Sequence, residues 1–180
     1  MYIYHENINQ IESERLILRF YKESDAEKVA YHCNNINLNK GVAGLPFPYT
    51  KDHALNWFER QKSENYPFFD FAIVIKETNE LVGSISLFDR INQRIGEIGY
   101  WIGEDHWHKG YATEACQAII HFAFETLHYH KVYARHFKSN PYSGKVMINC
   151  GMTKEGEQID HFYKNDHYET LVLYGLINNR

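Results

Sequence analysis

The sequence of 180 residues is poor in cysteine and proline and contains no long hydrophobic run. Its three cysteines, Cys33, Cys116 and Cys150, are widely spaced, and none has a Cys-x-x-Cys partner. This spacing argues against a zinc site or a redox dithiol and fits a reducing compartment, so we expect a cytoplasmic protein. The longest apolar runs are far too short to cross a membrane.

Several other signals are missing. The opening MYIYHENINQ has no basic stretch before an apolar one, so we expect no secretory signal. No run of Lys or Arg is long enough to follow a phosphate backbone, and the formal net charge is −4, so we expect no direct nucleic-acid binding. The sequence lacks the glycine motifs of Rossmann and P-loop proteins. Its eleven histidines never form a His-Glu-x-x-His pattern, so we expect no metal.

Aromatic residues are abundant, with 14 Tyr and 11 Phe. A tyrosine-rich core and surface would account for them, which composition alone favours, and so would an aromatic-lined cleft. Hydrophobic residues make up 44% of the chain, enough to bury the core of one domain spanning residues 1–180.

Hydrophobic periodicity predicts seven strands and four helices. The strands are expected at Arg15–Phe20, Phe69–Lys76, Leu81–Phe88, Ile95–Ile102, Lys131–His136, Thr153–Gln158 and Tyr168–Leu176. The helices are expected from a Ser24–Glu27 capping box through Cys33, from Thr50, from Gly110 to about Leu127, and from Pro141 to near Cys150, with a loop over Asn34–Pro48. This order predicts a single α/β domain with a mixed, mostly antiparallel seven-stranded sheet flanked by helices.

The most informative stretch is EIGYWIGEDHWHKGYATEA, from Glu97 to Ala115, where a strand ends and a helix begins. A helix start has unpaired N–H groups and the positive end of the helix dipole, so it binds phosphate readily. Gly110 lets the backbone approach an anion, and Lys109 adds a cation. An ordinary helix start explains the same residues equally well.

Five motifs in order resemble the GNAT acetyltransferase superfamily, and within it the ribosomal-protein N-terminal acetyltransferase branch. They cover nearly the whole chain: Glu14–Arg19, Leu45–Thr50, Gly99–Ile102, Gly110–Ala115, and Asn140 with Ser143, Gly151 and Met152. One position departs from the pattern, because Trp107 stands where the family has Gln or Arg.

The resemblance implies acetyl-CoA as the co-substrate, lying where the fourth and fifth strands splay apart. Its pantetheine would pair with the backbone of Tyr100, Trp101 and Ile102. Its pyrophosphate would meet the N–H groups of His108, Lys109, Gly110, Tyr111, Ala112 and Thr113. Asn140 and Ser143 would contact the pantetheine and the thioester sulfur.

Acetyl transfer to an amine needs a base, because an amine is cationic near neutral pH. Glu97 is our candidate base, and Ser143 is our candidate proton donor to the leaving thiolate. A solvent-facing strand glutamate and a first-turn helix serine are the alternative interpretations. The resemblance also places Tyr168 and Glu169 near the acceptor, although an ordinary edge-strand pair explains them better.

The expected partners are therefore acetyl-CoA and a primary amine, which includes a protein N-terminus such as that of a ribosomal protein. Acetylation of small amines, antibiotics or polyamines, and a CoA-binding sensor without turnover, are the alternatives. The loops Asn34–Thr50 and Asp160–His167 are expected to shape the acceptor pocket. The acidic net charge suits a cationic acceptor. The oligomeric state stays open, a homodimer included.

Overall fold

The structure, a computed structural model, describes residues 10–63, 66, 68–90 and 93–179. The first nine residues, on which the expectation about a secretory signal depends, lie outside this range. No helix in the described part is long and apolar enough to span a membrane. Cys33, Cys116 and Cys150 are free and buried.

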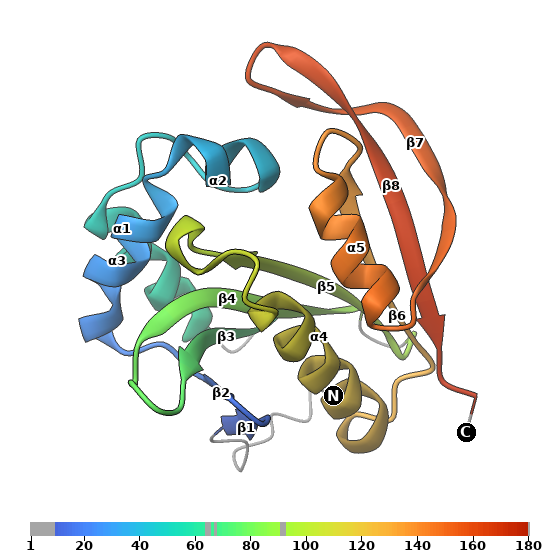
Figure 1. Cartoon of the computed structure of the whole chain (residues 1–180), viewed down its shortest axis with the longest axis horizontal. Helices are drawn as coiled ribbons and strands as arrows, with labels where there is room; N and C mark the ends of the chain where they lie inside the picture. Colours follow the sequence, from blue (N-terminus) through green and yellow to red (C-terminus); the bar gives the residue numbers. More distant parts are fainter. Residues whose placement is uncertain (1–9, 64–65, 67, 91–92, 180) are drawn as a thin grey trace.

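One sheet of eight strands runs through the molecule in the order β1-β2-β3-β4-β5-β6-β8-β7 (Figure 1). Its strands are β1 (Gln10–Glu12), β2 (Leu16–Arg19), β3 (Phe68–Ile75), β4 (Leu81–Arg90), β5 (Ile95–Ile102), β6 (Lys131–Phe137), β7 (Thr153–Lys164) and β8 (His167–Ile177). The predicted mixed α/β architecture is confirmed, and β1 is an eighth strand that we did not predict. Every neighbouring pair is antiparallel except β5 and β6.

The parallel strands β5 and β6 separate part of the way along their length. They pair from Ile95 with Lys131 to Ile98 with Ala134, and no pair follows. On its other side β5 stays paired with β4 as far as Ile102. The splay expected between the fourth and fifth predicted strands is therefore present, and it leaves one edge of β5 open over its second half.

Helices cover both faces of the sheet and create two hydrophobic cores. One face carries α4 (Tyr111–His121) and α5 (Pro141–Asn149), and its core includes Ile98, Ile119 and Met147. The other face carries α1 (Ala26–Cys33), α2 (Ile36–Gly41) and α3 (Lys51–Gln61), and its core includes Phe58 and Trp101. Side chains of β5 alternate between the two cores, as the two-residue period of a strand requires.

Four local predictions need correction. The capping box predicted at Ser24 and Glu27 is absent, because helical structure begins earlier, with η1 (Glu23–Asp25) after Lys22, whose N–H donates to the Asp25 carboxylate. The expected loop after Asn34 contains α2, because the Asn35 side chain accepts from the N–H groups of residues 37 and 38. The helix from Gly110 is α-helical only as far as His121, and a π-helical turn, η3 (Phe122–Thr126), follows it.

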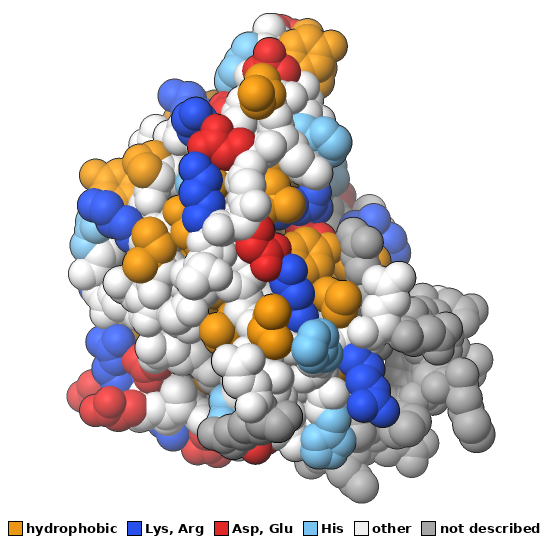
Figure 2. Space-filling view, turned by 90° about the vertical axis from the view of Figure 1, so that its right-hand side faces the viewer, with side chains coloured by type: hydrophobic (Ala, Val, Ile, Leu, Met, Phe, Trp, Pro, Cys, Tyr) orange, Lys and Arg blue, Asp and Glu red, His pale blue; other side chains and the backbone are white. Residues whose placement is uncertain are grey.

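The last two strands form a longer hairpin than expected, and this is the fourth correction. Most of the loop predicted at Asp160–His167 is strand, with a register shift between Gln158 and Phe162 and a turn at Asn165–Asp166. Lysines and glutamates of this region form ion pairs, such as Lys138 with Glu157. Figure 2, which faces this side of the molecule, shows the two signs of charge interspersed.

Candidate functional site

The start of α4 is built to leave backbone donors open. Gly110 occupies the N-cap position with φ of 81°, a left-handed conformation that favours glycine. No side chain caps this helix. The N–H groups of its first residues, Tyr111, Ala112 and Thr113, therefore have no partner inside the helix and are available to an anion.

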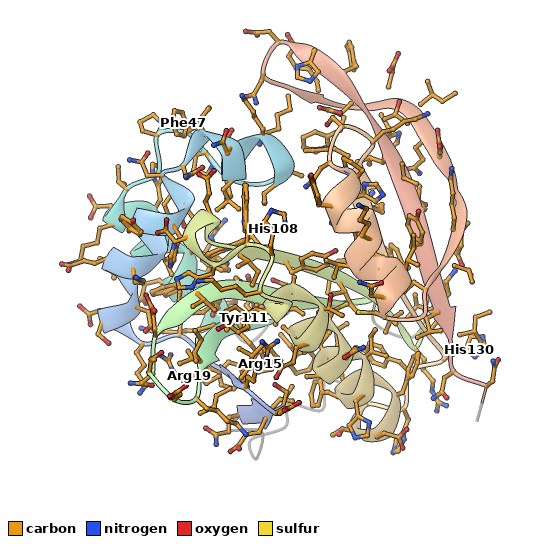
Figure 3. The ribbon with its side chains drawn as sticks, viewed as in Figure 1. Arg15, Arg19, Phe47, His108, Tyr111 and His130 are labelled. Atoms are coloured by element: carbon orange, nitrogen blue, oxygen red, sulfur yellow. The ribbon has the colours of Figure 1, made fainter. Side chains whose placement is uncertain are left out.

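A cation that the sequence analysis missed lies beside this helix start. Arg15 donates through Nε to Glu114 at 2.7 Å and through Nη1 to the carbonyl of Lys109 at 3.0 Å (Figure 3). Glu114 also accepts from the Ser13 hydroxyl and the Arg15 N–H. Partial burial raises the pKa of Glu114, but these hydrogen bonds outweigh it and the pKa is lowered. Arg15 thus offsets a carboxylate in the first turn that would repel a phosphate. The sequence signal for this cation was Glu114 itself, because an acid beside a predicted phosphate site needs a neutralising partner.

Tyr100 contributes its side chain as well as its backbone. Its hydroxyl lies 2.9 Å from both Oγ and the carbonyl oxygen of Ser143, in the first turn of α5. Burial raises the pKa of Tyr100, so its hydroxyl stays protonated. The structure therefore brings two predicted residues together and fixes the Ser143 hydroxyl opposite the unpaired half of β5.

Glu97 lies on β5 just before the strands separate. Its carboxylate accepts from the Tyr133 hydroxyl at 2.8 Å and from Arg135 Nε at 2.8 Å, both on β6. The side chain is 20% exposed, so Glu97 is more than a freely solvated strand residue. Strand alternation directs Glu97 to the face of the sheet opposite Tyr100 and α5. The structure thus places the candidate base and the candidate proton donor on opposite faces, with the gap beyond Ile98 between those faces.

Trp107, the departure from the family pattern, has a structural role. Its indole Nε1 donates to the carbonyl of Ile102 at 2.7 Å, and its ring packs against both hydrophobic cores. The Ile102 carbonyl therefore already has a partner within the chain. The side chains of Trp101 and Ile102 are buried, so these two residues can offer only backbone groups to a ligand.

The remaining predicted residues lie around the starts of α4 and α5. His108 and Lys109 are exposed and precede α4, and Lys109 Nζ donates to the carbonyl of Asp105. Asn140 occupies the N-cap of α5, but its side chain makes no capping hydrogen bond. The Asn140 side chain faces α2, because a Cβ built on Gly41 would lie 2.7 Å from Nδ2 of Asn140.

Tyr168 and Glu169 lie at the start of β8, where the strand pairs with β7 alone because its pairing with β6 begins only at Leu171. Tyr168 is exposed, whereas Glu169 is buried. The Glu169 carboxylate accepts from the Ser139 hydroxyl at 2.8 Å and lies 2.9 Å from Nε2 of His167. The carbonyl of Asn165 and then Glu169 raise the pKa of His167.

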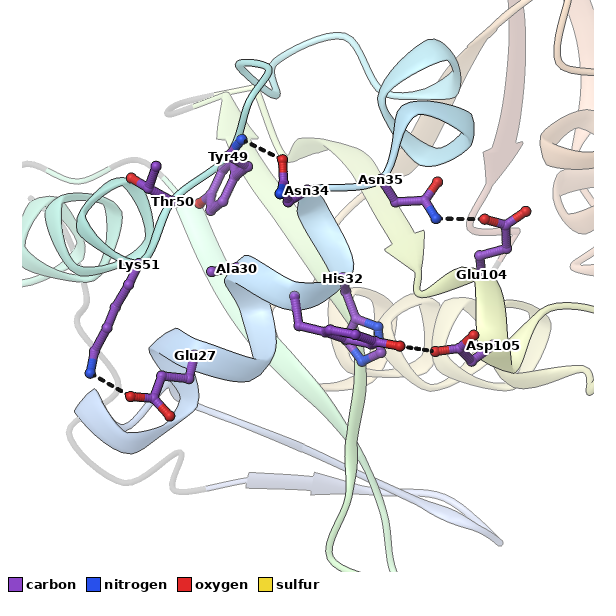
Figure 4. Close-up of a pocket in the computed structure, with 11 residues that line it drawn as sticks. Glu27, Ala30, His32, Asn34, Asn35, Tyr49, Thr50, Lys51, Glu104 and Asp105 are labelled. Atoms are coloured by element: carbon purple, nitrogen blue, oxygen red, sulfur yellow. Dashed lines mark hydrogen bonds and ion pairs between the residues drawn. The ribbon is translucent and has the colours of Figure 1, made fainter.

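A separate pocket of about 530 Å³ lies on the α1 side (Figure 4). Its carboxylates are Glu27, Glu104 and Asp105, and the loop residues Asn34, Asn35, Tyr49 and Thr50 also line it. Lys51 pairs with Glu27, whereas neutral groups, the Asn35 amide and the Tyr31 hydroxyl, bind the other two. The pocket thus has an excess of negative charge. Among the described residues, no group of three or more His, Cys, Asp or Glu side chains could hold a metal ion.

Known proteins are similar to this chain in sequence and in fold. Residues 15–153 match the family model described as acetyltransferase (GNAT) domain. An uncharacterized N-acetyltransferase, p20, of Bacillus licheniformis is 30% identical over 92% of this chain and 94% of its own length. The ribosomal protein uS5-alanine N-acetyltransferase of Escherichia coli is 24% identical over 98% and 95%.

A solved structure extends the likeness to the fold. The spermidine N-acetyltransferase of Vibrio cholerae, in complex with CoA and spermine, has a TM-score of 0.79 at 22% identity and covers 92% of this chain and 96% of its own. The family model alone matches more than two thirds of the chain. The chain is therefore an acyltransferase that belongs to the acetyltransferase (GNAT) domain family.

Proposed function

We propose that this protein transfers the acetyl group of acetyl-CoA to a primary amine by direct attack in a ternary complex. The observation that carries the proposal is the separation of β5 from β6 beyond Ile98, between the uncapped start of α4 and the Ser143 hydroxyl. An open strand edge offers N–H and C=O groups to the amides of pantetheine. The helix start offers N–H groups to the pyrophosphate.

The chemistry then uses both faces of the sheet. Glu97, directly or through a water, accepts a proton from the acceptor ammonium, and the neutral amine attacks the thioester carbonyl carbon. The tetrahedral intermediate expels CoA thiolate as the C–S bond breaks. Ser143 gives its proton to that thiolate, and Tyr100 holds the Ser143 hydroxyl in place through their hydrogen bond. The new amide nitrogen and the protonated Glu97 each lose one proton to solvent, and Ser143 regains one from solvent, so one proton is released for each acetyl group transferred.

The acceptor class that we propose is a cationic amine. The loop after Asn34 lines the acidic pocket of Figure 4, where three carboxylates face only one cation. Negative potential of this kind draws a cationic substrate. A protein N-terminus and a polyamine both have this chemistry, and relatives of both kinds are represented by the uS5-alanine and spermidine enzymes.

The test is thiol release from acetyl-CoA with peptides bearing a free N-terminus, polyamines and aminoglycoside antibiotics, beside thermal unfolding with CoA. We expect CoA to raise the melting temperature and at least one amine to stimulate thiol release. Stabilisation by CoA without transfer to any amine would establish the alternative, a CoA-binding sensor. No stabilisation by CoA would overturn both interpretations.

A further inference from the structure

Two buried thiols from distant parts of the sequence meet where α4 packs against α5 (Figure 1). Cys116 lies in α4, and Cys150 follows the last residue of α5. The two thiols hydrogen-bond to each other, and Sγ of Cys150 also donates to the carbonyl of Thr113 at 3.6 Å. Thr113 and Cys116 lie one turn apart on the same face of α4. The fold therefore creates a dithiol that the wide spacing of the cysteines in the sequence conceals.

The two thiols of this pair differ in access and in acidity. Cys116 is fully buried, whereas Cys150 keeps 9% of its surface exposed. The hydrogen bond from Cys116 lowers the pKa of Cys150, and the same contact together with burial raises the pKa of Cys116. The thiolate form of cysteine is the one that attacks an oxidant. Cys150 is therefore the nucleophile of the pair, and Cys116 is placed to react with it in a second step.

Cys33 provides a contrast within the same chain. It lies in α1, in the hydrophobic core on the other face of the sheet, whereas Cys116 and Cys150 share the α4 core. Burial raises the pKa of Cys33 to about 12. A thiol of this kind stays protonated and is inert. Of the three cysteines in the sequence, only Cys116 and Cys150 combine a neighbouring thiol with access and a lowered pKa.

We propose that Cys116 and Cys150 are a modification site, at which hydrogen peroxide converts the two thiols to a reversible disulfide. The Cys150 thiolate attacks one peroxide oxygen, the O–O bond breaks, and hydroxide leaves to form water with the proton that Cys150 released. Cys150 is then a sulfenic acid. The Cys116 sulfur attacks the sulfenic sulfur, the S–O bond breaks, and hydroxide leaves with the Cys116 proton as a second water. Two electrons pass from the thiols to the peroxide.

The disulfide changes the helix that carries the donor site. A disulfide holds its sulfurs about 2.05 Å apart, closer than a hydrogen-bonded pair, so α4 and the end of α5 must approach each other. Cys150 also loses the S–H that donates to Thr113, in the first turn of α4, where the N–H groups proposed for the pyrophosphate lie. The oxidised protein should therefore bind acetyl-CoA more weakly. This consequence, unlike the disulfide itself, rests on the proposed function.

Intact-mass analysis and peptide mapping after treatment with hydrogen peroxide test the chemistry. The wild-type protein should lose the mass of two hydrogen atoms, with Cys116 joined to Cys150, and dithiothreitol should reverse the change. Cys116→Ala should stop at the sulfenic acid of Cys150, which dimedone traps, and Cys150→Ala should form neither product. Cys33→Ala is the matched control and should oxidise as the wild type does. A wild-type protein in which peroxide joins no Cys116 to Cys150 would overturn the modification site.

Calorimetric titration of acetyl-CoA into the reduced and the oxidised protein, after removal of peroxide, tests the consequence. Acetyl-CoA is the probe because the free thiol of CoA would reduce the disulfide. We expect the Kd to be about threefold to tenfold higher for the oxidised protein. An equal Kd in the two states would overturn the effect of the disulfide on the donor site. A protein that binds acetyl-CoA in neither state would instead overturn the proposed function and leave the disulfide intact.

Discussion

The Nε atom of Arg15 lies 2.7 Å from the carboxylate of Glu114, although 99 residues separate them in the sequence. This ion pair joins the segment before β2 to the first turn of α4. It also connects stability with the donor site, because the same guanidinium holds the carbonyl of Lys109 next to Gly110.

The Arg15–Glu114 pair should make stability depend on pH in the acid range. The folded-state pKa of Glu114 is lowered, so its contribution to the free energy of unfolding is present above the ordinary glutamate pKa and is lost as pH falls through the folded value. Glu114→Gln should remove this dependence. Urea unfolding of wild type and variant between about pH 3 and 7 measures it. Parallel pH profiles for the two proteins would contradict the prediction.

Gly110→Ala should weaken both folding and CoA binding. Its φ of 81° costs an L-residue about 1 kcal/mol, and the new Cβ would lie 3.3 Å from Nη2 of Arg15. Gly151→Ala is the matched control, because φ there is 82° and the Cβ would meet nothing within 4 Å. Both variants should melt at a lower temperature than wild type, and only Gly110→Ala should raise the Kd for CoA. Equal CoA affinity in the two variants would count against an anion site at this helix start.

Glu97→Gln should lower kcat about 10²-fold to 10⁴-fold if Glu97 is the general base. CoA affinity should stay unchanged, because Glu97 lies on the face opposite α5. Glu157→Gln is the control, since that carboxylate is also paired with cations, Lys138 and Lys154, but lies on β7. Steady-state kinetics with the best acceptor measure both variants. Wild-type kcat in Glu97→Gln would remove it from the mechanism.

Ser143→Ala should lower kcat more than Tyr100→Phe does. The serine donates directly to the thiolate in the proposed mechanism, whereas Tyr100 orients it through a 2.9 Å hydrogen bond. Single-turnover measurements with saturating acetyl-CoA separate this step from binding. If Tyr100→Phe lowers kcat more than Ser143→Ala does, Tyr100 is the proton donor and the proposed role of Ser143 is wrong.

Glu169→Gln should bring the pKa of His167 down towards its ordinary value. The carbonyl of Asn165 and the Glu169 carboxylate both favour the imidazolium. The pair contributes stability below the ordinary histidine pKa, and this contribution is lost as pH rises through the folded value. NMR titration of the histidine ring protons follows the change. An identical His167 titration in the variant would show that Glu169 has no part in it.

Strong local signals made the sheet predictable. The alternation of Ile98, Tyr100 and Ile102 identifies a strand with one face in the α4 core, and the bounds of β5 are as predicted. Gly151, with φ of 82°, follows α5 in the left-handed conformation that commonly ends a helix, and α5 ends near Cys150 as predicted. The short strand β1 and the helix α2 were missed because each has few residues and a weak apolar pattern.

The site could be predicted only in part, because its contacts join distant segments. Glycine at the start of α4 is a local signal. The Arg15–Glu114 pair and the Tyr100–Ser143 hydrogen bond need the fold before they become visible. The hydrogen bond from the Ser139 hydroxyl to Glu169 needs the fold in the same way, because 30 positions separate the two residues.

The unpaired edge of β5 beyond Ile98 affects how the protein recognises an acetyl donor. Along an unpaired strand edge the groups that meet a ligand are peptide N–H and C=O, which are the same for every residue type except proline. Side chains on β5 can then pack in the two hydrophobic cores, as Trp101 and Ile102 do, without also contacting the ligand. Backbone groups along this edge can thus keep binding the same donor while the sequence changes. The surrounding side chains can change to bind different acceptors.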